Sequence, residues 1–422
     1  MKRGQANTND ALLLISNHPL GRRVLDVIKT AGGEARYVGG IVRDALAGIA
    51  PQDWPDLDMA MTLPPDAAMK ALKADGLKVL PTGIDHGTIT VFDKKDHRQK
   101  IELTTLRSDL NTDGRHAEVM FTQDWAGDAA RRDFTINAIY LDGNGEIFDP
   151  CDGQNDLKNG VVRFIGKAED RIREDFLRIL RFFRFHARFA TTDPDDETMA
   201  AITKLAPQLD QISGERQAME LARLLPMGDT KGLAAMITTG VDRVLMAGDA
   251  AGDATGFDGA AMATLSKMAR SMSFTVLPLA ACYAVLLQEN ALPVIFERLR
   301  LSQKLRRQIS YMASPLDAEG LTSDQWQAEA WRAKPHADAN RTDLVWRFAV
   351  SQAKAGQMID HDHFYRLLEW QAPEFPVKGQ DLLDYGVAQG PSLGQRLQSL
   401  EDDWVASGFT LTRDDLLAPL KG

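Results

Sequence analysis

Two aspartates, Asp56 and Asp58, stand one residue apart at the start of the alternating segment 57–61. An extended strand turns residues i and i+2 to the same face, so both carboxylates would converge on one point. Two such groups repel each other unless a cation lies between them, and oxygen ligands of this kind suit Mg²⁺. An isolated Asp-x-Asp is more often a solvated turn, so the metal hypothesis depends on other residues.

The residues upstream support this hypothesis. Gly39 and Gly40 follow the short strand-like segment 35–38, and Arg43 and Asp44 come next. Glycines let a triphosphate approach the backbone and can present N–H groups to it, and Arg43 could bind a phosphate. The order of strand, Gly-Gly, Arg-Asp and then Asp-x-Asp is much more specific than any of its parts.

A third acidic residue, Glu102, lies in the alternating segment 99–106. If this strand flanks the strand that carries Asp58, Glu102 completes a cage of three carboxylates that could hold two metal ions. Taken alone, an exposed glutamate on a strand is the simpler interpretation.

The charged triplet Arg131-Arg132-Asp133 runs directly into an apolar segment that contains Asn137. An arginine at such an edge could contact phosphates, and Asn137 could bond a ribose or the backbone. An ordinary helix start with an aspartate near its N-terminus would look the same.

A later segment carries Asp175, Arg178, Arg181 and Arg184 on what the spacing predicts to be one continuous helix over residues 169–188. Asp175 and Arg178 would be i, i+3 neighbours on it. An aspartate accepts and an arginine donates, so the pair matches the edge that cytosine and adenine share, an amino group beside a ring acceptor. Uracil and guanine would present a carbonyl to the carboxylate. For an isolated pair, a plain salt bridge is the alternative.

The elements change character along the chain. Short strands and helices are mixed up to about residue 167, and nearly every later segment has helical spacing. The segment 158–188 is locally basic although the net charge is −10. Two cysteines are too few for a disulfide framework, and we expect a reducing, cytoplasmic location. No apolar run of about 18 residues predicts a membrane span, and no secretory signal is evident.

Taken in this order, the four motifs resemble those of the class II tRNA nucleotidyltransferases, the CCA-adding enzymes, a family that also includes the bacterial poly(A) polymerases. The resemblance is dense over residues 35–188 and looser through 212–216. It implies that the chain transfers C, C and then A from CTP and ATP to the 3′ end of tRNA, with Mg²⁺ as cofactor and pyrophosphate as the leaving group.

The resemblance also implies roles for individual residues. Asp56, Asp58 and Glu102 match the catalytic carboxylates that hold the metal. The nucleotide-binding positions match Gly39, Gly40, Arg43, Arg132, Asp175, Arg178, Arg181 and Arg184. The segment from Asp149 through Gly153 to Asp156 matches a motif at the hinge between the head and the neck.

Two local features favour CCA addition. Residues 81–88 are similar to the CCA-adding branch, where poly(A) polymerases carry a Gly-Arg-Arg-Phe-like stretch, and residues 107–128 resemble the loop of enzymes that add the terminal A. The alternatives are a poly(A) polymerase, or an A-adding enzyme that works with a separate CC-adding partner.

The expected fold is an α/β nucleotidyltransferase head, a small mixed sheet with helices, followed by an all-α neck, body and tail. The predicted boundaries are 1–142 for the head or palm, 143–210 for the neck with the nucleobase-recognition helices, 211–372 for the body and 373–422 for the tail, a candidate tRNA contact. No membrane and no obligate protein partner is expected. His361-Asp362-His363 resembles the ligand pair of an HD phosphohydrolase, but its other ligands are not evident, so exposed helix-cap residues are expected there.

Overall fold

The chain divides into two compact units. The computed structural model describes residues 8–49, 57–93, 99–110, 118–247, 256–314, 327–328, 331, 341–358, 364–365, 368–371 and 373–420. The first unit comprises Met1–Leu221 and Lys231–Leu245, and the second comprises Ala222–Thr230 and Met246–Gly422. Asp56 and the segment 361–363 therefore lie outside the described residues.

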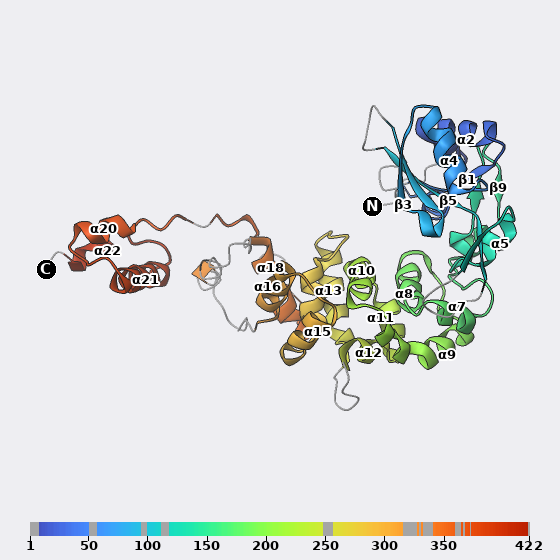
Figure 1. Ribbon diagram of the computed structural model, residues 1–422. Coiled ribbons are helices and arrows are strands. Elements are labelled where there is room, and N and C mark those ends of the chain that lie inside the picture. Colours follow the sequence, from blue (N-terminus) through green and yellow to red (C-terminus); the bar gives the residue numbers. More distant parts are fainter. Residues whose placement is uncertain are drawn as a thin grey trace. The chain divides into compact units, whose positions relative to one another are not determined.

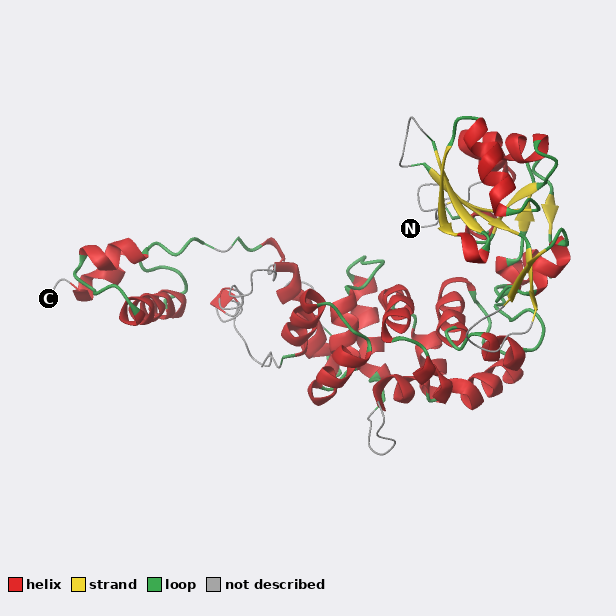
Figure 2. Ribbon diagram, in the orientation of Figure 1, coloured by secondary structure: helices red, strands yellow, loops and turns green. Residues whose placement is uncertain are grey.

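All described strands belong to the first unit (Figure 2). Seven of them form one sheet in the order β3 (Lys78–Gly83), β4 (Thr88–Phe92), β5 (Lys100–Thr105), β2 (Leu57–Met61), β1 (Ala35–Val38), β8 (Tyr140–Leu141) and β9 (Ile147–Phe148). Strands β2 and β5 run parallel, whereas the other neighbours are antiparallel. Strands β6 (Arg107–Leu110) and β7 (Glu118–Phe121) form a separate antiparallel pair.

One face of the sheet is buried by helices of the head. Helices α1 (Thr8–Ser16), α2 (Pro19–Thr30) and α4 (Pro65–Ala74) share one apolar core with the sheet (Figure 1). Met59 and Met61 of β2 belong to this core. Because side chains alternate along a strand, Asp58, the residue before Met59, faces the opposite side of the sheet.

The rest of the first unit is mostly helical. It contains α3 (Gly40–Leu46), α5 (Trp125–Ala130), α6 (Gly153–Asn159), α7 (Ala168–Glu174), α8 (Arg178–Phe189), α9 (Asp196–Leu205), α10 (Gly214–Leu224), α11 (Thr230–Thr238) and α12 (Val241–Ala247), the ends of α10 and α12 passing into the second unit. The rings of Phe134, Phe164 and Phe182 pack on one another, with centroids 4.8 to 6.2 Å apart. These contacts attach α8 to the segment before β8, which carries Phe134, and to the segment after α6, which carries Phe164.

The predicted continuous helix over residues 169–188 is wrong. Helix α7 ends at Glu174, Asp175 is extended with φ −155°, and α8 begins at Arg178. The carboxylate of Asp175 accepts a hydrogen bond from the backbone N–H of Leu177, an arrangement typical of a residue that starts a new helix. Asp175 and Arg178 are therefore not neighbours within one helix.

The second unit is helical throughout its described part. Its helices are α13 (Gly259–Ser271), α14 (Leu279–Leu286), α15 (Leu292–Arg298), α16 (Gln303–Ala313), α18 (Arg341–Lys354), α20 (Gly379–Asp384), α21 (Pro391–Ala406) and α22 (Arg413–Leu417). Near the C-terminus, the ring of Trp404 contacts Trp331, Phe375 and Phe409 in a small core of its own. The expected fold class, a small mixed sheet followed by helices, is confirmed.

Within the described residues no single helix is long and apolar enough to cross a membrane. One helix pair, Leu279–Leu286 with Glu289–Arg298, passes such a test by length and composition, although it is bent by 113°.

Candidate active site

The face of the sheet opposite the apolar core of the head brings two of the predicted carboxylates together. In the parallel pairing of β2 with β5, Asp58 is the direct partner of Glu102. Directly paired residues share a face, and neighbouring strands lie about 4.8 Å apart, so the two side chains are adjacent. Glu102 is exposed and Asp58 is partly buried. The condition set from the sequence, that the strand of Glu102 flanks the strand of Asp58, is therefore met.

Hydroxyl groups continue the polar face beside these carboxylates. Thr90 is the partner of Glu102 on β4, and its Oγ1 lies 2.7 Å from Oγ1 of Thr82. Thr104, two residues after Glu102, pairs with Thr88, and their Oγ1 atoms are 3.0 Å apart. Carboxylates and hydroxyls supply the hard oxygen atoms that suit Mg²⁺, so this donor set fits such an ion. Within the described chain, which lacks Asp56, no group of three acidic, His or Cys residues is close enough to hold a metal.

The glycine turn lies at the same edge of the sheet. The antiparallel pairing of Tyr37 with Met59 brings the end of β1 beside the start of β2, and so brings Gly39 and Gly40 near Asp58. Gly39 has φ +73° and ψ −130°. Residues with a side chain rarely adopt this backbone conformation, although a Cβ there would meet nothing within 4 Å. Glycine is therefore required by the backbone geometry and not by lack of room.

Arg43 lies in different surroundings from those expected of a phosphate ligand. It is only 5% exposed, and its Nε and Nη2 donate to Oδ1 of Asp44 at 2.8 and 2.6 Å. Its Nη1 donates to Oδ1 of Asn137 at 2.5 Å, and its guanidinium lies over the rings of Phe185 and Phe189. Arg43 thus joins α3 to α8, and a direct phosphate contact stays a prediction.

A chain of buried polar contacts continues from Arg43 toward α8. The amide of Asn137 donates to Oδ1 of Asp133 at 3.0 Å, and Arg181 donates from Nε to the other carboxylate oxygen at 2.8 Å. Burial raises the pKa of Asp133, but Arg181 and the hydrogen bonds from Asn137 and Phe134 lower it more, so the pKa lies below its ordinary value. Asp133 is therefore ionised at neutral pH.

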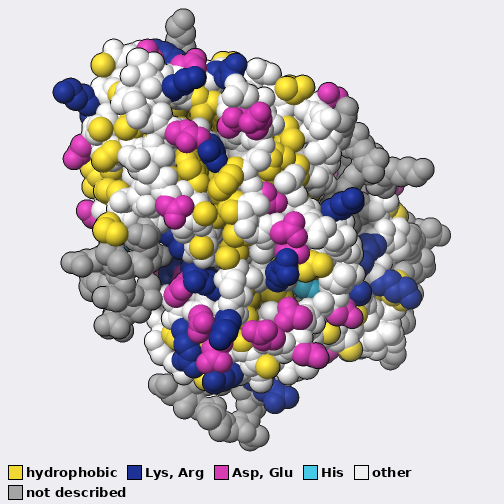
Figure 3. Space-filling model, turned by 90° about the vertical axis from the view of Figure 1, so that its right-hand side faces the viewer, with side chains coloured by type: hydrophobic (Ala, Val, Ile, Leu, Met, Phe, Trp, Pro, Cys, Tyr) yellow, Lys and Arg dark blue, Asp and Glu magenta, His cyan; other side chains and the backbone are white. Residues whose placement is uncertain are grey.

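Arg184, the last arginine of the predicted set, also forms an ion pair within the protein. Arg184 donates from Nε to Oε2 of Glu220 at 2.6 Å, and Arg188 donates to Asp44 at 2.9 Å. These two pairs hold α8 to α10 and α3, and the pair of Arg181 with Asp133 holds α8 to the segment that follows α5. Arg181 and Arg184 thus form ion pairs with the protein, and their contact with a nucleotide stays a prediction. On the face drawn in Figure 3, basic and acidic side chains likewise lie beside one another and not in separate patches.

The pair predicted to read the base is held by Arg216 and Glu174, neither of which was among the predicted site residues. Oδ2 of Asp175 accepts from Nη2 of Arg216 at 2.8 Å. Arg178 donates to Oε2 of Glu174 at 2.5 Å and to the carbonyl oxygen of Arg171 at 2.9 Å. The side chains of Asp175 and Arg178 thus form ion pairs with Arg216 and Glu174 and not with each other, and their contact with a base stays a prediction. The segment 212–216 that carries Arg216 was noted, but not as a partner of Asp175.

Arg132 is the remaining predicted nucleotide ligand. Its Nε and Nη2 donate to Oδ2 of Asp128 at 3.3 and 3.0 Å, and its Nε also lies 3.1 Å from the hydroxyl of Tyr140. Its side chain is 21% exposed. Asp128 was not among the predicted residues.

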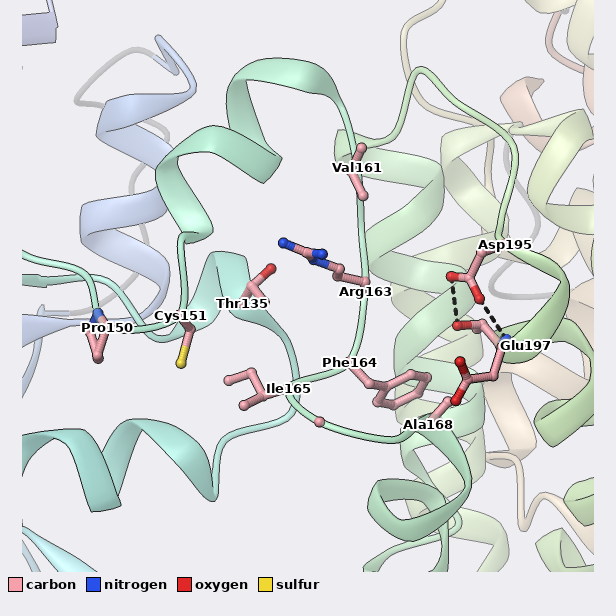
Figure 4. A pocket seen from close by; sticks show the side chains of 12 residues that line it. Thr135, Pro150, Cys151, Val161, Arg163, Phe164, Ile165, Ala168, Asp195 and Glu197 are labelled. Atoms are coloured by element: carbon pink, nitrogen blue, oxygen red, sulfur yellow. Dashed lines mark hydrogen bonds between the residues drawn. The ribbon is translucent and has the colours of Figure 1, made fainter.

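A cavity of about 810 Å³ lies elsewhere in the first unit. Figure 4 shows Thr135, Cys151 and Arg163 on one side of it and Asp195 and Glu197 on the other. None of the residues predicted from the sequence as site residues lines it. The cavity is thus separate from the residues that carry the proposed chemistry.

Comparisons with known proteins identify the family. The family described as poly A polymerase head domain matches residues 35–163, and the family described as the probable RNA and SrmB-binding site of polymerase A matches residues 193–246. The mitochondrial CCA tRNA nucleotidyltransferase 1 of Homo sapiens is 33% identical over 396 residues, covering 92% of this chain and 86% of the human protein. The chain belongs to the CCA tRNA nucleotidyltransferase family. The CCA-adding enzyme of Streptococcus sanguinis is 40% identical over 221 residues, about half of each chain.

Solved structures of CCA-adding enzymes have the same fold. The structure of the Bacillus stearothermophilus enzyme in complex with CTP matches with a TM-score of 0.68 and 24% identity, covering 94% of this chain and 95% of that one. The Thermotoga maritima enzyme complexed with tRNA matches with a TM-score of 0.69 and 20% identity over 98% and 97% of the two chains. The resemblance seen in the sequence to class II CCA-adding enzymes is confirmed.

Proposed function

We propose that this chain adds C, C and A to the 3′ end of tRNA, using CTP and ATP and releasing pyrophosphate. The observation that carries the proposal is that Asp58 and Glu102 are direct partners on neighbouring strands of the sheet in a member of the CCA tRNA nucleotidyltransferase family. A site of two adjacent carboxylates next to a glycine turn suits nucleotidyl transfer, in which positioning and charge stabilisation supply most of the catalysis.

The cofactor that this site would hold is Mg²⁺. Asp58 and Glu102 would be ligands, together with Asp56, which lies outside the described residues. When bound, the ion supplies positive charge that activates the attacking hydroxyl and stabilises charge on the phosphate oxygens. The hydroxyl of Thr90 beside Glu102 adds to the polar surroundings.

The remaining residues of the site bind and orient the substrates. The oxygen of the RNA 3′-hydroxyl forms a bond to the α-phosphorus of the nucleotide, and the bond from that phosphorus to pyrophosphate breaks. No protein nucleophile is required. Arg132 would contact the nucleotide, since its charge is only partly balanced by Asp128. Asp175 and Arg178 would accept and donate at the base edge that cytosine and adenine share.

The metal site is tested by changing Asp58 to Asn. This change keeps the side-chain shape and removes one charged ligand, so we expect turnover on tRNA lacking its CCA end to fall at least ~10³-fold. Asp66→Asn is the matched control because Asp66 is an exposed carboxylate on α4 of the same unit. Retained turnover in Asp58→Asn would contradict the assignment of the site.

Base selection is tested by changing Asp175 to Asn or Arg216 to Gln. Losing the carboxylate of Asp175 removes the acceptor that rejects a carbonyl, so incorporation of UTP relative to CTP should rise about tenfold or more. Arg216→Gln removes a contact to Asp175 without touching a base-reading atom, and a smaller rise is expected. An unchanged ratio of UTP to CTP in Asp175→Asn would refute the base-reading role.

Poly(A) synthesis is a second candidate because the family that matches residues 35–163 is described as a poly A polymerase head domain. ATP alone would then extend many RNAs by long A tracts. We further propose a cytoplasmic location, from the cysteine usage, although the human and mouse relatives are mitochondrial by name. Fractionation of cells that produce the protein, with a cytosolic marker as control, would test this location.

We also infer the division into head (1–142), neck (143–210), body (211–372) and tail (373–422), with the tail as a tRNA contact. The described tail helices surround an apolar core with Leu382, Trp404 and Leu417. If the tail binds tRNA, exchange of the partly exposed Arg396 for Glu in α21 should weaken tRNA binding and leave CTP binding unchanged. Unchanged tRNA affinity after this charge reversal would count against the contact.

A further inference from the structure

Asp128 of α5 is a buried carboxylate at the centre of a hydrogen-bond cluster. It is 1% exposed. Its Oδ1 accepts from Nε and Nη2 of Arg131 at 2.9 and 2.5 Å and from the backbone N–H of Arg107 at 3.4 Å. Its Oδ2 accepts from Nη2 and Nε of Arg132 at 3.0 and 3.3 Å and from the hydroxyl of Tyr140 at 2.8 Å. One carboxylate therefore connects three separate segments of the first unit.

The charges of this cluster do not cancel. Burial raises the pKa of Asp128, but Arg132, Arg131 and the Tyr140 hydroxyl together lower it more, so the carboxylate is ionised. Two guanidinium groups share this single negative charge, which leaves the cluster with a net positive charge. The side chains of Arg131 and Arg132 remain 16% and 21% exposed, so part of this charge is accessible to an anion from solvent.

The geometry restricts how Arg132 can point. Two of its nitrogens are directed at Asp128, one of them also contacts the Tyr140 hydroxyl, and its guanidinium lies 5.2 Å from the centre of the Tyr140 ring. Long side chains lose rotamer freedom when they are fixed. In this protein, that ordering is already present before a nucleotide binds.

The contact with Arg107 extends the cluster to a second element. Arg107 is the first residue of β6, and its backbone N–H points at the same oxygen that holds Arg131. Its Nη1 also donates to the carbonyl oxygen of His86 at 2.8 Å. Both β6 and β7 belong to the segment 107–128, which resembles the loop of A-adding enzymes. The orientation of Arg132 and the base of this strand pair therefore depend on one side chain.

We propose that Asp128 is a positioning residue that orients Arg132 toward the nucleotide and ties the β6–β7 pair to it. The inference rests on the proposed function, because it takes Arg132 as a nucleotide ligand. Asp128 itself does not touch the substrates. The competing possibility is that Asp128 only stabilises α5, in which case its loss would lower the stability and leave nucleotide binding unchanged.

The test compares Asp128→Asn with Asp124→Asn in the full chain. Asp124 lies four residues earlier and caps the same helix by accepting from the N–H of Ala126 at 3.0 Å. Both variants lose one carboxylate from α5, but only Asp128→Asn releases Arg132. CTP and ATP binding is measured by calorimetry without RNA, and kcat and KM are measured on tRNA lacking its CCA end, below the unfolding temperature of each variant.

For Asp128→Asn we expect the Kd and KM for both nucleotides to rise about tenfold. We expect kcat for A addition to fall more than kcat for C addition. Asp124→Asn keeps an oxygen that can cap α5 and should leave all these constants within twofold. Nucleotide constants in Asp128→Asn that match those of Asp124→Asn would overturn the proposal.

Two further measurements keep the test decisive. In an Arg132→Gln background, Asp128→Asn should have little further effect on nucleotide affinity, because the two residues act in series; an undiminished effect would overturn the proposal. If Asp128→Asn does not fold, Tyr140→Phe takes its place, and a two- to fivefold rise in nucleotide Kd is expected, whereas an unchanged Kd would overturn it. Failure of the proposed function would appear differently, as wild-type protein that binds nucleotides without extending tRNA.

Discussion

Exchange of Asp44 for Asn should destabilise the first unit strongly. Asp44 is 0% exposed and accepts three hydrogen bonds, two from Arg43 at Oδ1 and one from Arg188 at Oδ2. The asparagine side chain has the same shape but carries no charge and only one acceptor oxygen. Arg43 would keep its bond to Asn137 but would lose its buried counter-charge.

The size of the effect follows from the burial of each partner. Removing one member of a buried ion pair costs about 3–5 kcal/mol, and Arg43 has a side chain only 6% exposed. Arg188 is 35% exposed, so solvent screens its pair, and its share is about 0–1 kcal/mol. We expect a loss of about 3–6 kcal/mol in the free energy of unfolding. For a unit of this size, the unfolding temperature should fall by roughly 10 °C.

Calorimetric unfolding of the full chain, with hydrogen exchange followed in peptides from α3 and α8, measures this effect in the first unit. Asp26→Asn is the matched control because it removes the same charge from an exposed position of α2, and a change within about 0.5 kcal/mol is expected. A loss below about 1 kcal/mol in Asp44→Asn would refute the reasoning that the Arg43 pair is buried and essential to the attachment of α8.

Three other predictions concern the same unit. The pKa values of Asp128 and Asp133 are lowered on folding, so the stability they contribute is present above the unfolded pKa near 3.9 and is lost as the pH falls through the lower folded value. Urea titrations between about pH 5 and 2 should show this loss. The free energy of unfolding should fall less steeply with decreasing pH in Asp133→Asn than in the wild type, and an equally steep fall would contradict the assignment. Gly153→Ala should destabilise by ~3 kcal/mol, since its Cβ would lie 2.2 Å from the carbonyl oxygen of Thr135; an unfolding temperature like that of wild type would contradict this close approach. Burial raises the pKa of Cys151, so its alkylation at pH 7.5 should be slower than that of a free thiol, and a rate equal to free cysteine would be inconsistent with this environment.

The mixed sheet and the proximity of Asp58 to Glu102 could be predicted from the sequence because they depend on local alternation. Period-two alternation assigns one face to Met59 and the other to Asp58, and only the strand order had to be supplied as a condition. The helix break at Asp175 was missed, since no glycine or proline marks it. The signal available was Asp175 itself, a residue type that favours helix starts by accepting a backbone N–H.

The surroundings of the arginines could not be predicted in the same way. Arg43 and Asn137 are 94 residues apart, Asp133 and Arg181 are 48 apart, and no local pattern indicates such pairings. A motif shows that an arginine is present but not whether it faces a ligand or the protein. Asp128 was missed for the same reason, because its role appears only when Arg132 and Tyr140 are seen around it.

The products formed on tRNA that lacks its CCA end test the central claim most directly. The purified protein is incubated with this RNA and with CTP alone, ATP alone or both, with Asp58→Asn as the inactive control, and the 3′ ends are sequenced. We expect two added C residues with CTP alone, almost no extension with ATP alone, and CCA ends with both. Long A tracts with ATP alone, or extension only of RNA that already ends in CC, would contradict CCA addition by this chain.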